Sequence, residues 1–138
     1  MSFREKSAWI SLISIAIVGF VFFLHVPRTL APPPSPDIFD ALLICLAGLV
    51  VIEVIAHAVV AIRAPLDAQA PKDERELMIE LRAIRRAAYV YAPLSMGAVS
   101  LLHLGANGAA LGYGVLLALV TAELVNYGSR VLDYRRER

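Results

Sequence analysis

Two ionisable side chains interrupt an otherwise apolar stretch of the chain. Glu53 and His57 are four residues apart, so on a helix they lie on the same face. Glu123, Asn126 and Tyr127 follow at spacings of three and four in a second apolar stretch, again on one helical face. Such side chains can exchange a proton, bind a cation or form hydrogen bonds. We therefore expect these two faces to contain the candidate site.

The depth of these side chains in a membrane follows from helix geometry. At 1.5 Å per residue, Glu53 lies roughly 15 Å from the membrane edge marked by Arg63. Tyr91 lies roughly 8 Å from the edge marked by Arg86 by the same measure. A charged group near the bilayer centre costs at least about 2.5 kcal/mol. Glu53 and Glu123 should therefore face other helices, either protonated or paired with a cation.

Three interpretations of this cluster remain open. The side chains could form an interhelical hydrogen-bond network that fixes the packing, worth about 0.6 kcal/mol per bond in membranes. They could instead form a binding site or a proton or cation relay that opens to the cytoplasm. A metal or haem site needs converging ligands, and one helix supplies only two here, so no metal and no cofactor is predicted. The predicted ligand or ion site consists of Glu53, His57, Glu123, Asn126, Tyr127 and Tyr91.

The chain lacks the sequence motifs of common enzyme classes. It contains no G-x-S-x-G, no P-loop, no H-E-x-x-H and no glycine-rich dinucleotide turn. The single cysteine, Cys45, lies in an apolar run, where a small core residue is expected rather than a reactive thiol. No catalytic residue is predicted, and the sequence leans against an enzyme without deciding the question.

Four apolar segments must position these side chains. The chain of 138 residues is 59% hydrophobic and 18% charged, whereas a soluble domain is about 25% charged. A helix needs roughly 20 apolar residues to cross a bilayer, and four stretches meet that length. The sequence thus predicts an all-α polytopic membrane protein, a four-transmembrane-helix bundle that forms a single domain over residues 1–138. The expected spans are residues 7–24, 40–62, 87–104 and 109–128.

Three connectors join the predicted spans. Residues 25–37 contain five prolines, which favour an extended, polyproline-like segment. Residues 63–72 are polar and bounded by proline, as in a loop, and a short turn precedes the fourth span. Gly108 and Gly112 have the G-x-x-x-G spacing that permits close approach of two helices. We expect this approach within the last hairpin, with a dimer interface as the alternative.

A charged helix is expected to lead into the third span and to extend it into the cytoplasm. Asp73 and Glu76 form a capping-box pattern at its start. An apolar stripe from Leu77 to Ala88 then follows at spacings of four, three and four. This stripe either packs on the protein or lies at the headgroups, or it docks a cytoplasmic protein or a second copy. The predicted docking residues are Glu74, Leu77, Leu81, Arg82 and Arg85.

The positive charges predict the orientation. Lys and Arg number two in the N-terminal tail, six from residue 63 to 86 and four in the C-terminal tail, twelve in all. The first connector has one and the third has none. Positively charged segments stay cytoplasmic, so both termini and the middle loop are expected there. No basic run is dense enough to predict nucleic-acid binding.

Short segments of the chain resemble a known family. Glu5–Ile10 at the start of the first span is similar to the start of small bacterial membrane proteins grouped under a domain of unknown function. Asp73–Glu76 and Arg85–Tyr89, before and at the entry of the third span, carry the same resemblance. The resemblance covers most of the chain and implies a four-helix protein of the bacterial inner (cytoplasmic) membrane. It supplies no catalytic residues.

The resemblance also implies a partner, because such proteins are thought to be encoded beside small helix-turn-helix regulators. The leading hypothesis is a non-enzymatic inner-membrane protein that acts through its cytoplasmic face, as a sensor or partner of a cytoplasmic regulatory protein. The alternative is a small proton- or cation-coupled transporter, or a lipid- or quinone-binding protein, that uses Glu53, His57 and Glu123. Small multidrug-resistance transporters have four helices, but their essential glutamate is in the first span, which here has no acidic residue. The expected partners are the lipid bilayer, a cytoplasmic protein and a second copy in a homodimer.

Overall fold

A computed structural model describes residues 3–29 and 37–136, the side chains of residues 25–29, 37–39, 41, 67 and 68 excepted. These described residues are almost entirely helical and contain no strand. The four long helices are α1 (Phe3–Thr29), α2 (Asp37–Arg63), α4 (Glu74–Ser100) and α5 (Gly108–Arg136). Two short helices accompany them, α3 (Pro65–Gln69) after α2 and the 3-10 helix η1 (Leu101–Leu104) after α4.

Each of the four long helices has a stretch long and apolar enough to cross a membrane. The prediction of an all-helical, multi-pass membrane protein is confirmed at this level. The helices are longer than the predicted spans because polar residues extend them. α1 runs to Thr29, into the predicted proline connector, of which residues 30–36 lie outside the described residues. The predicted basic tail belongs to α5 as far as Arg136, and α3 occupies part of the predicted polar loop.

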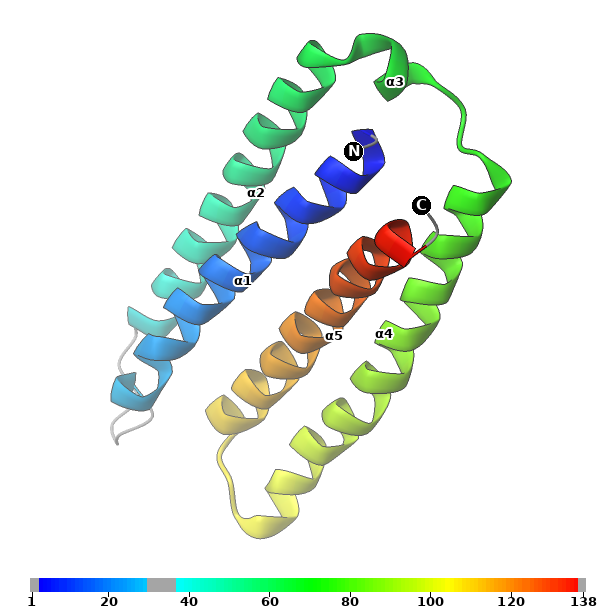
Figure 1. The fold of residues 1–138 in the computed structure, drawn as a ribbon. Coiled ribbons are helices and arrows are strands. Elements are labelled where there is room, and N and C mark those ends of the chain that lie inside the picture. Colours follow the sequence, from blue (N-terminus) through cyan, green and yellow to red (C-terminus); the bar gives the residue numbers. More distant parts are fainter. Residues whose placement is uncertain (1–2, 30–36, 137–138) are drawn as a thin grey trace.

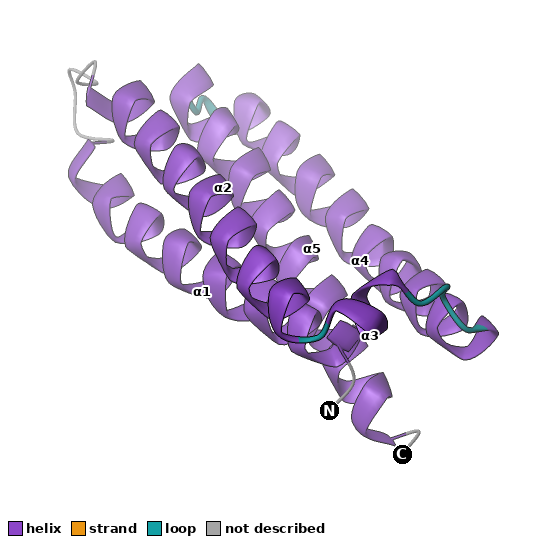
Figure 2. Cartoon of the chain, turned by 90° about the horizontal axis from the view of Figure 1, so that it is seen from above, coloured by secondary structure: helices purple, strands orange, loops and turns teal. Residues whose placement is uncertain are grey.

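The long helices lie side by side in the order α2, α1, α5 and α4 (Figure 1). α1 packs on both α2 and α5, and α5 packs on both α1 and α4. Over the described ranges, α2 makes no close backbone contact with α4 or α5. The arrangement is therefore an open row with α1 and α5 inside. The four helices run roughly along one another (Figure 2), and both chain ends lie at the end of the molecule that carries α3 (Figure 1).

The outer helix α2 is lined with exposed aliphatic side chains. Ile44 is 71% exposed and Ile62 is 78% exposed, and the apolar window of this helix contains no fully buried residue. Such a surface would be unfavourable in water, because large contiguous apolar patches are rare on soluble proteins. It is the surface expected of a helix that faces lipid.

Small residues allow the closest helix contact, which joins α4 to α5. A Cβ atom added to Gly114 would lie 2.8 Å from the Cβ atom of Ala98, so only glycine fits there. The predicted close approach at Gly108 and Gly112 is wrong within the described part of the molecule, because a Cβ atom at either would meet nothing within 4 Å. The hairpin does contain a glycine contact, but it lies further along α5.

The helix α4 begins at the predicted capping box. The backbone amide of Glu74 donates to Oδ1 of Asp73 at 2.7 Å, and the amide of Asp73 donates to Oε2 of Glu76 at 3.4 Å. These bonds satisfy amide groups that the first helical turn leaves without partners. Ile79 and Ala83, in the following turns, are completely buried. The charged start of α4 is thus a packed part of the molecule.

Candidate functional site

Two hydrogen bonds join α1 to α2 at the end of the molecule where the chain termini lie. The hydroxyl group of Ser7 lies 2.7 Å from Nε2 of His57, and the hydroxyl group of Ser11 donates to Oε2 of Glu53 at 2.9 Å. The two helices are antiparallel, so a spacing of four on α1 meets a spacing of four on α2. The predicted pair of Glu53 and His57 therefore faces α1 and holds the first hairpin together.

The ring of His57 is held in one orientation. Its Nδ1 atom lies 2.8 Å from the backbone oxygen of Glu53 and 3.2 Å from the Oε2 atom of the same residue. Both neighbours of Nδ1 are acceptors, so a hydrogen on Nδ1 is bonded to them, while Nε2 faces the hydroxyl group of Ser7. Oε1 of Glu53 is buried and has no hydrogen-bond partner among the described residues. This oxygen is the one unsatisfied acceptor of the pair, and a proton or a bound donor would satisfy it.

A second polar chain runs along α5. The side-chain amide of Asn126 donates to Oε2 of Glu123 at 3.2 Å, and Nε of Arg130 donates to Oδ1 of Asn126 at 3.1 Å. Arg130 also pairs with Glu80 of α4 at 3.3 Å, and its guanidinium group lies 5.1 Å from the ring centroid of Tyr127. Asn126 and Tyr127 therefore contact one cation directly, and Glu123 is joined to it through Asn126.

The two nearest arginines of α4 and α5, Arg86 and Arg130, do not contact Glu123 directly. Arg130 reaches Glu123 only through Asn126, which accepts from one and donates to the other. Arg86 instead forms an ion pair with Asp133 of α5 at 2.9 Å, and the Asp133 side chain is almost completely buried. Glu123 is thus bound to a neutral amide group, because the arginines lie nearer the end of the molecule.

An apolar groove of about 180 Å³ lies between α1, α2 and α5. We call it the lipidic groove. Its walls are aliphatic and aromatic side chains of α1 between Ile15 and Phe23, of α2 between Leu42 and Leu49, and of α5 between Leu116 and Val120. Glu123 also lines it and is the ionisable member among the described lining residues, while Cys45 contributes from α2. The predicted acidic residue of α5 therefore borders an apolar space.

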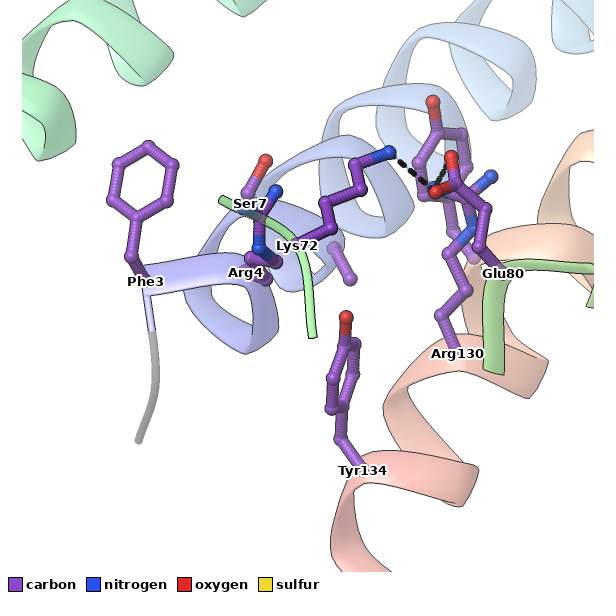
Figure 3. Close-up of a pocket in the computed structure, with 9 residues that line it drawn as sticks. Phe3, Arg4, Ser7, Lys72, Glu80, Arg130 and Tyr134 are labelled. Carbon is purple, nitrogen blue, oxygen red and sulfur yellow. Dashed lines mark hydrogen bonds and ion pairs between the residues drawn. The ribbon is translucent and has the colours of Figure 1, made fainter. Parts of the chain in front are cut away.

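A polar cavity of about 160 Å³ lies nearer the end of the molecule that carries the termini (Figure 3). We call it the charged cavity. Lys72 and Arg130 both reach Glu80 across it, as the dashed lines in Figure 3 show. Its full lining is Phe3, Arg4, Ser7, Ala8, Lys72, Glu80, Tyr127, Arg130 and Tyr134.

The charged cavity also places α4 relative to the polar cluster. It joins Glu80 of α4 to Ser7 of α1, and Ser7 contacts His57. The charged turns of α4 therefore lie beside Ser7 and His57. A depth counted along α2 from Arg63 could not show this arrangement. Such a count describes one helix and gives no information on how far the neighbouring helices extend past it.

The structure divides the predicted ligand site between two helix pairs. Glu53 and His57 contact α1, whereas Glu123, Asn126 and Tyr127 lie along α5. Tyr91 lies on α4 with 38% of its surface exposed, and it belongs to neither hydrogen-bond network of the described residues. Among the predicted docking residues, Glu74, Leu77, Leu81 and Arg85 are exposed, and Arg82 is half-buried with its Nε donating to the backbone oxygen of Met78 at 3.2 Å.

Several residues of the hydrogen-bond networks and of the charged cavity were not among the predicted site residues. The four-residue spacing of Ser7 and Ser11 matches that of Glu53 and His57, and this match could have predicted their pairing in an antiparallel hairpin. Arg4, Lys72 and Glu80 have no comparable signal. They come together only because α1 and α5 are neighbours and the chain before α4 passes over them.

Comparisons of the chain with known protein families, with characterised proteins and with solved structures found no match. The functional argument therefore depends on the geometry of the two cavities and the polar networks. Over the described residues, no group of three or more His, Cys, Asp and Glu side chains could hold a metal ion.

Proposed function

We propose that this chain is a non-enzymatic membrane protein that binds a lipid-like amphiphile in the lipidic groove. The observation that carries the proposal is the groove itself, which has apolar walls from three helices and one carboxyl group, that of Glu123. Apolar walls with few polar groups are typical of small-molecule sites. The geometry therefore favours, among the functions considered from the sequence, the binding of a lipid or a quinone.

The size of the groove defines which part of a ligand it accepts. Its volume of about 180 Å³ is below the roughly 300 Å³ at which drug-sized ligand sites begin. The groove would thus hold a segment of an extended acyl or isoprenoid chain rather than a whole molecule.

Glu123 would supply the polar end of the interaction. Its carboxyl group already accepts from Asn126 through Oε2. A ligand that carries a hydroxyl, amine or ring N–H group could donate to the remaining acceptor positions. Because Glu123 lies on the wall of the groove, we expect it to select the headgroup of the ligand. The aliphatic walls would accept many different acyl or isoprenoid chains.

The proposal includes a location in the inner membrane of a bacterium, with both termini in the cytoplasm. Its support is the distribution of Lys and Arg, twelve on the proposed cytoplasmic side against one on the other. In this orientation Glu123 lies toward the cytoplasmic half of the membrane. A role for Glu74, Leu77, Leu81, Arg82 and Arg85 in docking a cytoplasmic protein, or a second copy, stays a prediction.

Two adjacent residues of α2 provide a matched test. Cys45 lines the lipidic groove, whereas Ile44 points away from the protein and is 71% exposed. Cys45→Trp should fill the groove, while Ile44→Trp should leave it open. The retained lipid of each purified variant is measured by lipid-resolved native mass spectrometry. We expect Cys45→Trp to bind its most retained lipid about tenfold more weakly than the parent protein, which corresponds to about 1.4 kcal/mol.

Ile44→Trp should retain the lipid as the parent protein does. Equal retention by both variants would contradict the proposal, because the groove would then contribute nothing to binding. Circular dichroism of both variants verifies that the helices are intact. Glu123→Gln adds a test of selectivity, since it keeps the shape of the side chain and should change which lipid headgroup is retained.

A further inference from the structure

We propose that the charged cavity is a binding site for a phosphate group, either of a free phosphate or of an anionic lipid headgroup. Arg4 of α1, Lys72 of the segment before α4 and Arg130 of α5 all line it. Three segments distant in the sequence thus bring one cation each to a single cavity of about 160 Å³. The proposal does not depend on the lipidic groove or on what it binds.

The balance of charge at the cavity favours an anion. Glu80 is the acidic residue among its described lining residues, and Arg4 pairs outside the lining set with Glu76. Three cations therefore face two carboxylates, which leaves one positive charge. Phosphate contributes more negative charge and more acceptor oxygens than a carboxylate, so it can be shared by several cations at once.

The cations already converge on an oxyanion. Lys72 and Arg130 both contact the carboxylate of Glu80 (Figure 3). Arg130 uses Nε for Asn126 and Nη1 for Glu80, and a guanidinium group has five N–H donors. Its remaining donors, and those of the Lys72 ammonium group, can bind phosphate oxygens without breaking the contacts to Glu80.

Neutral donors complete the site. The phenol group of Tyr134 points into the space between Arg4 and Arg130 (Figure 3), and Tyr127 also lines the cavity. Arg4 is held by two contacts, the ion pair with Glu76 and a hydrogen bond of 2.9 Å from Nη2 to the backbone oxygen of Ala70. A cation fixed in this way loses little conformational freedom when it binds a ligand.

The position of the charged cavity explains why a lipid headgroup is one of the two proposed sources of the phosphate group. On α5, Arg130 and Tyr134 follow Val120 and Glu123 at helical spacing, so both cavities open on one face of that helix. The lipidic groove lies toward the apolar middle of the helices and the charged cavity toward their polar ends. Membrane phosphate groups occur at this boundary, and free phosphate also reaches it from solution.

The test compares two double variants that remove the same charge. Arg4→Gln/Lys72→Gln removes two cations from the cavity, while Lys6→Gln/Arg63→Gln removes two exposed cations outside its lining. Full-length protein is placed in phosphatidylcholine nanodiscs with inorganic phosphate, or in nanodiscs that contain phosphatidylglycerol. Binding is measured from the shift of the unfolding temperature, and for the lipid also by native mass spectrometry.

We expect the cavity variant to bind about 25-fold more weakly than the charge-matched control, since each of the two cations removed contributes about fivefold near an anionic group. Loss of stabilisation by inorganic phosphate identifies a free phosphate site, and loss confined to phosphatidylglycerol identifies a headgroup site. Equal binding by the two double variants in both arms would overturn the proposal. If the cavity variant is poorly folded, Tyr134→Phe decides, because it removes one donor only and should weaken binding severalfold.

Discussion

At the scale of single residues, the side chain of Glu53 connects α2 to α1. One carboxylate oxygen accepts from Ser11 and lies near Nδ1 of His57, while the other is buried without a partner among the described residues. A buried acceptor that loses its partner costs about 1 to 3 kcal/mol. The hydroxyl group of Ser11 is therefore expected to stabilise the first hairpin by more than an ordinary surface hydrogen bond would.

Ser11→Ala tests this contribution. Removing the hydroxyl group takes a donor from Oε2 of Glu53, whose Oε1 has none, so we expect the free energy of unfolding to fall by about 1 kcal/mol. Ser100→Ala is the matched control, because the Ser100 hydroxyl group donates to Met96 within its own helix and joins no two helices. Unfolding by SDS titration in mixed micelles measures both. A change of equal size in the two variants would show that the contact between Ser11 and Glu53 contributes nothing specific.

At the scale of helices, composition predicts the elements well and their contacts poorly. The apolar runs predict four spans, and Asp73 with Glu76 predicts where α4 begins, because both signals are local. The apolar stripe from Leu77 to Ala88 was expected to be one candidate packing face, yet Ile79 and Ala83 are the buried residues. In a membrane protein apolar side chains occur on lipid-facing and buried faces alike, so periodicity cannot distinguish them.

Two glycine residues of α5 give a prediction at the scale of helices. The same substitution to alanine is expected to lower the free energy of unfolding at one position and to leave it equal or higher at the other. Gly114→Ala would place a methyl group 2.8 Å from Ala98 and force α4 and α5 apart, so we expect a loss of about 1 to 3 kcal/mol. Gly112→Ala adds the same methyl group where nothing lies within 4 Å, and alanine favours helix by up to about 1 kcal/mol. Unfolding free energies in mixed micelles should therefore fall for the first variant and stay equal or rise for the second. Equal losses in both would contradict the packing of α4 on α5.

At the scale of the whole molecule, the order of the helices decides what the polar residues can do. The sequence predicts a shared site for Glu53 and Glu123 because both lie on inward-facing helical faces. In the structure α1 lies between α2 and α5, so Glu53 pairs with Ser11 while Glu123 borders the groove. Neighbour order depends on long-range packing, and no spacing within one helix encodes it. The helix face of each candidate residue was thus predictable from spacing, but its neighbours on other helices were not.

The same order places both chain ends and α3 at one end of the molecule and the turn between η1 and α5 at the other (Figure 1). The positive-inside rule predicts that the first end is cytoplasmic. Cys45 is the single cysteine, so Cys45→Ser gives a background for labelling new cysteines with a membrane-impermeant maleimide. We expect Asn107→Cys to be labelled in intact spheroplasts and Arg63→Cys only after permeabilisation, because both residues are exposed at opposite ends. Labelling of Arg63→Cys alone in intact spheroplasts would reverse the orientation and place the charged cavity on the outer side of the membrane.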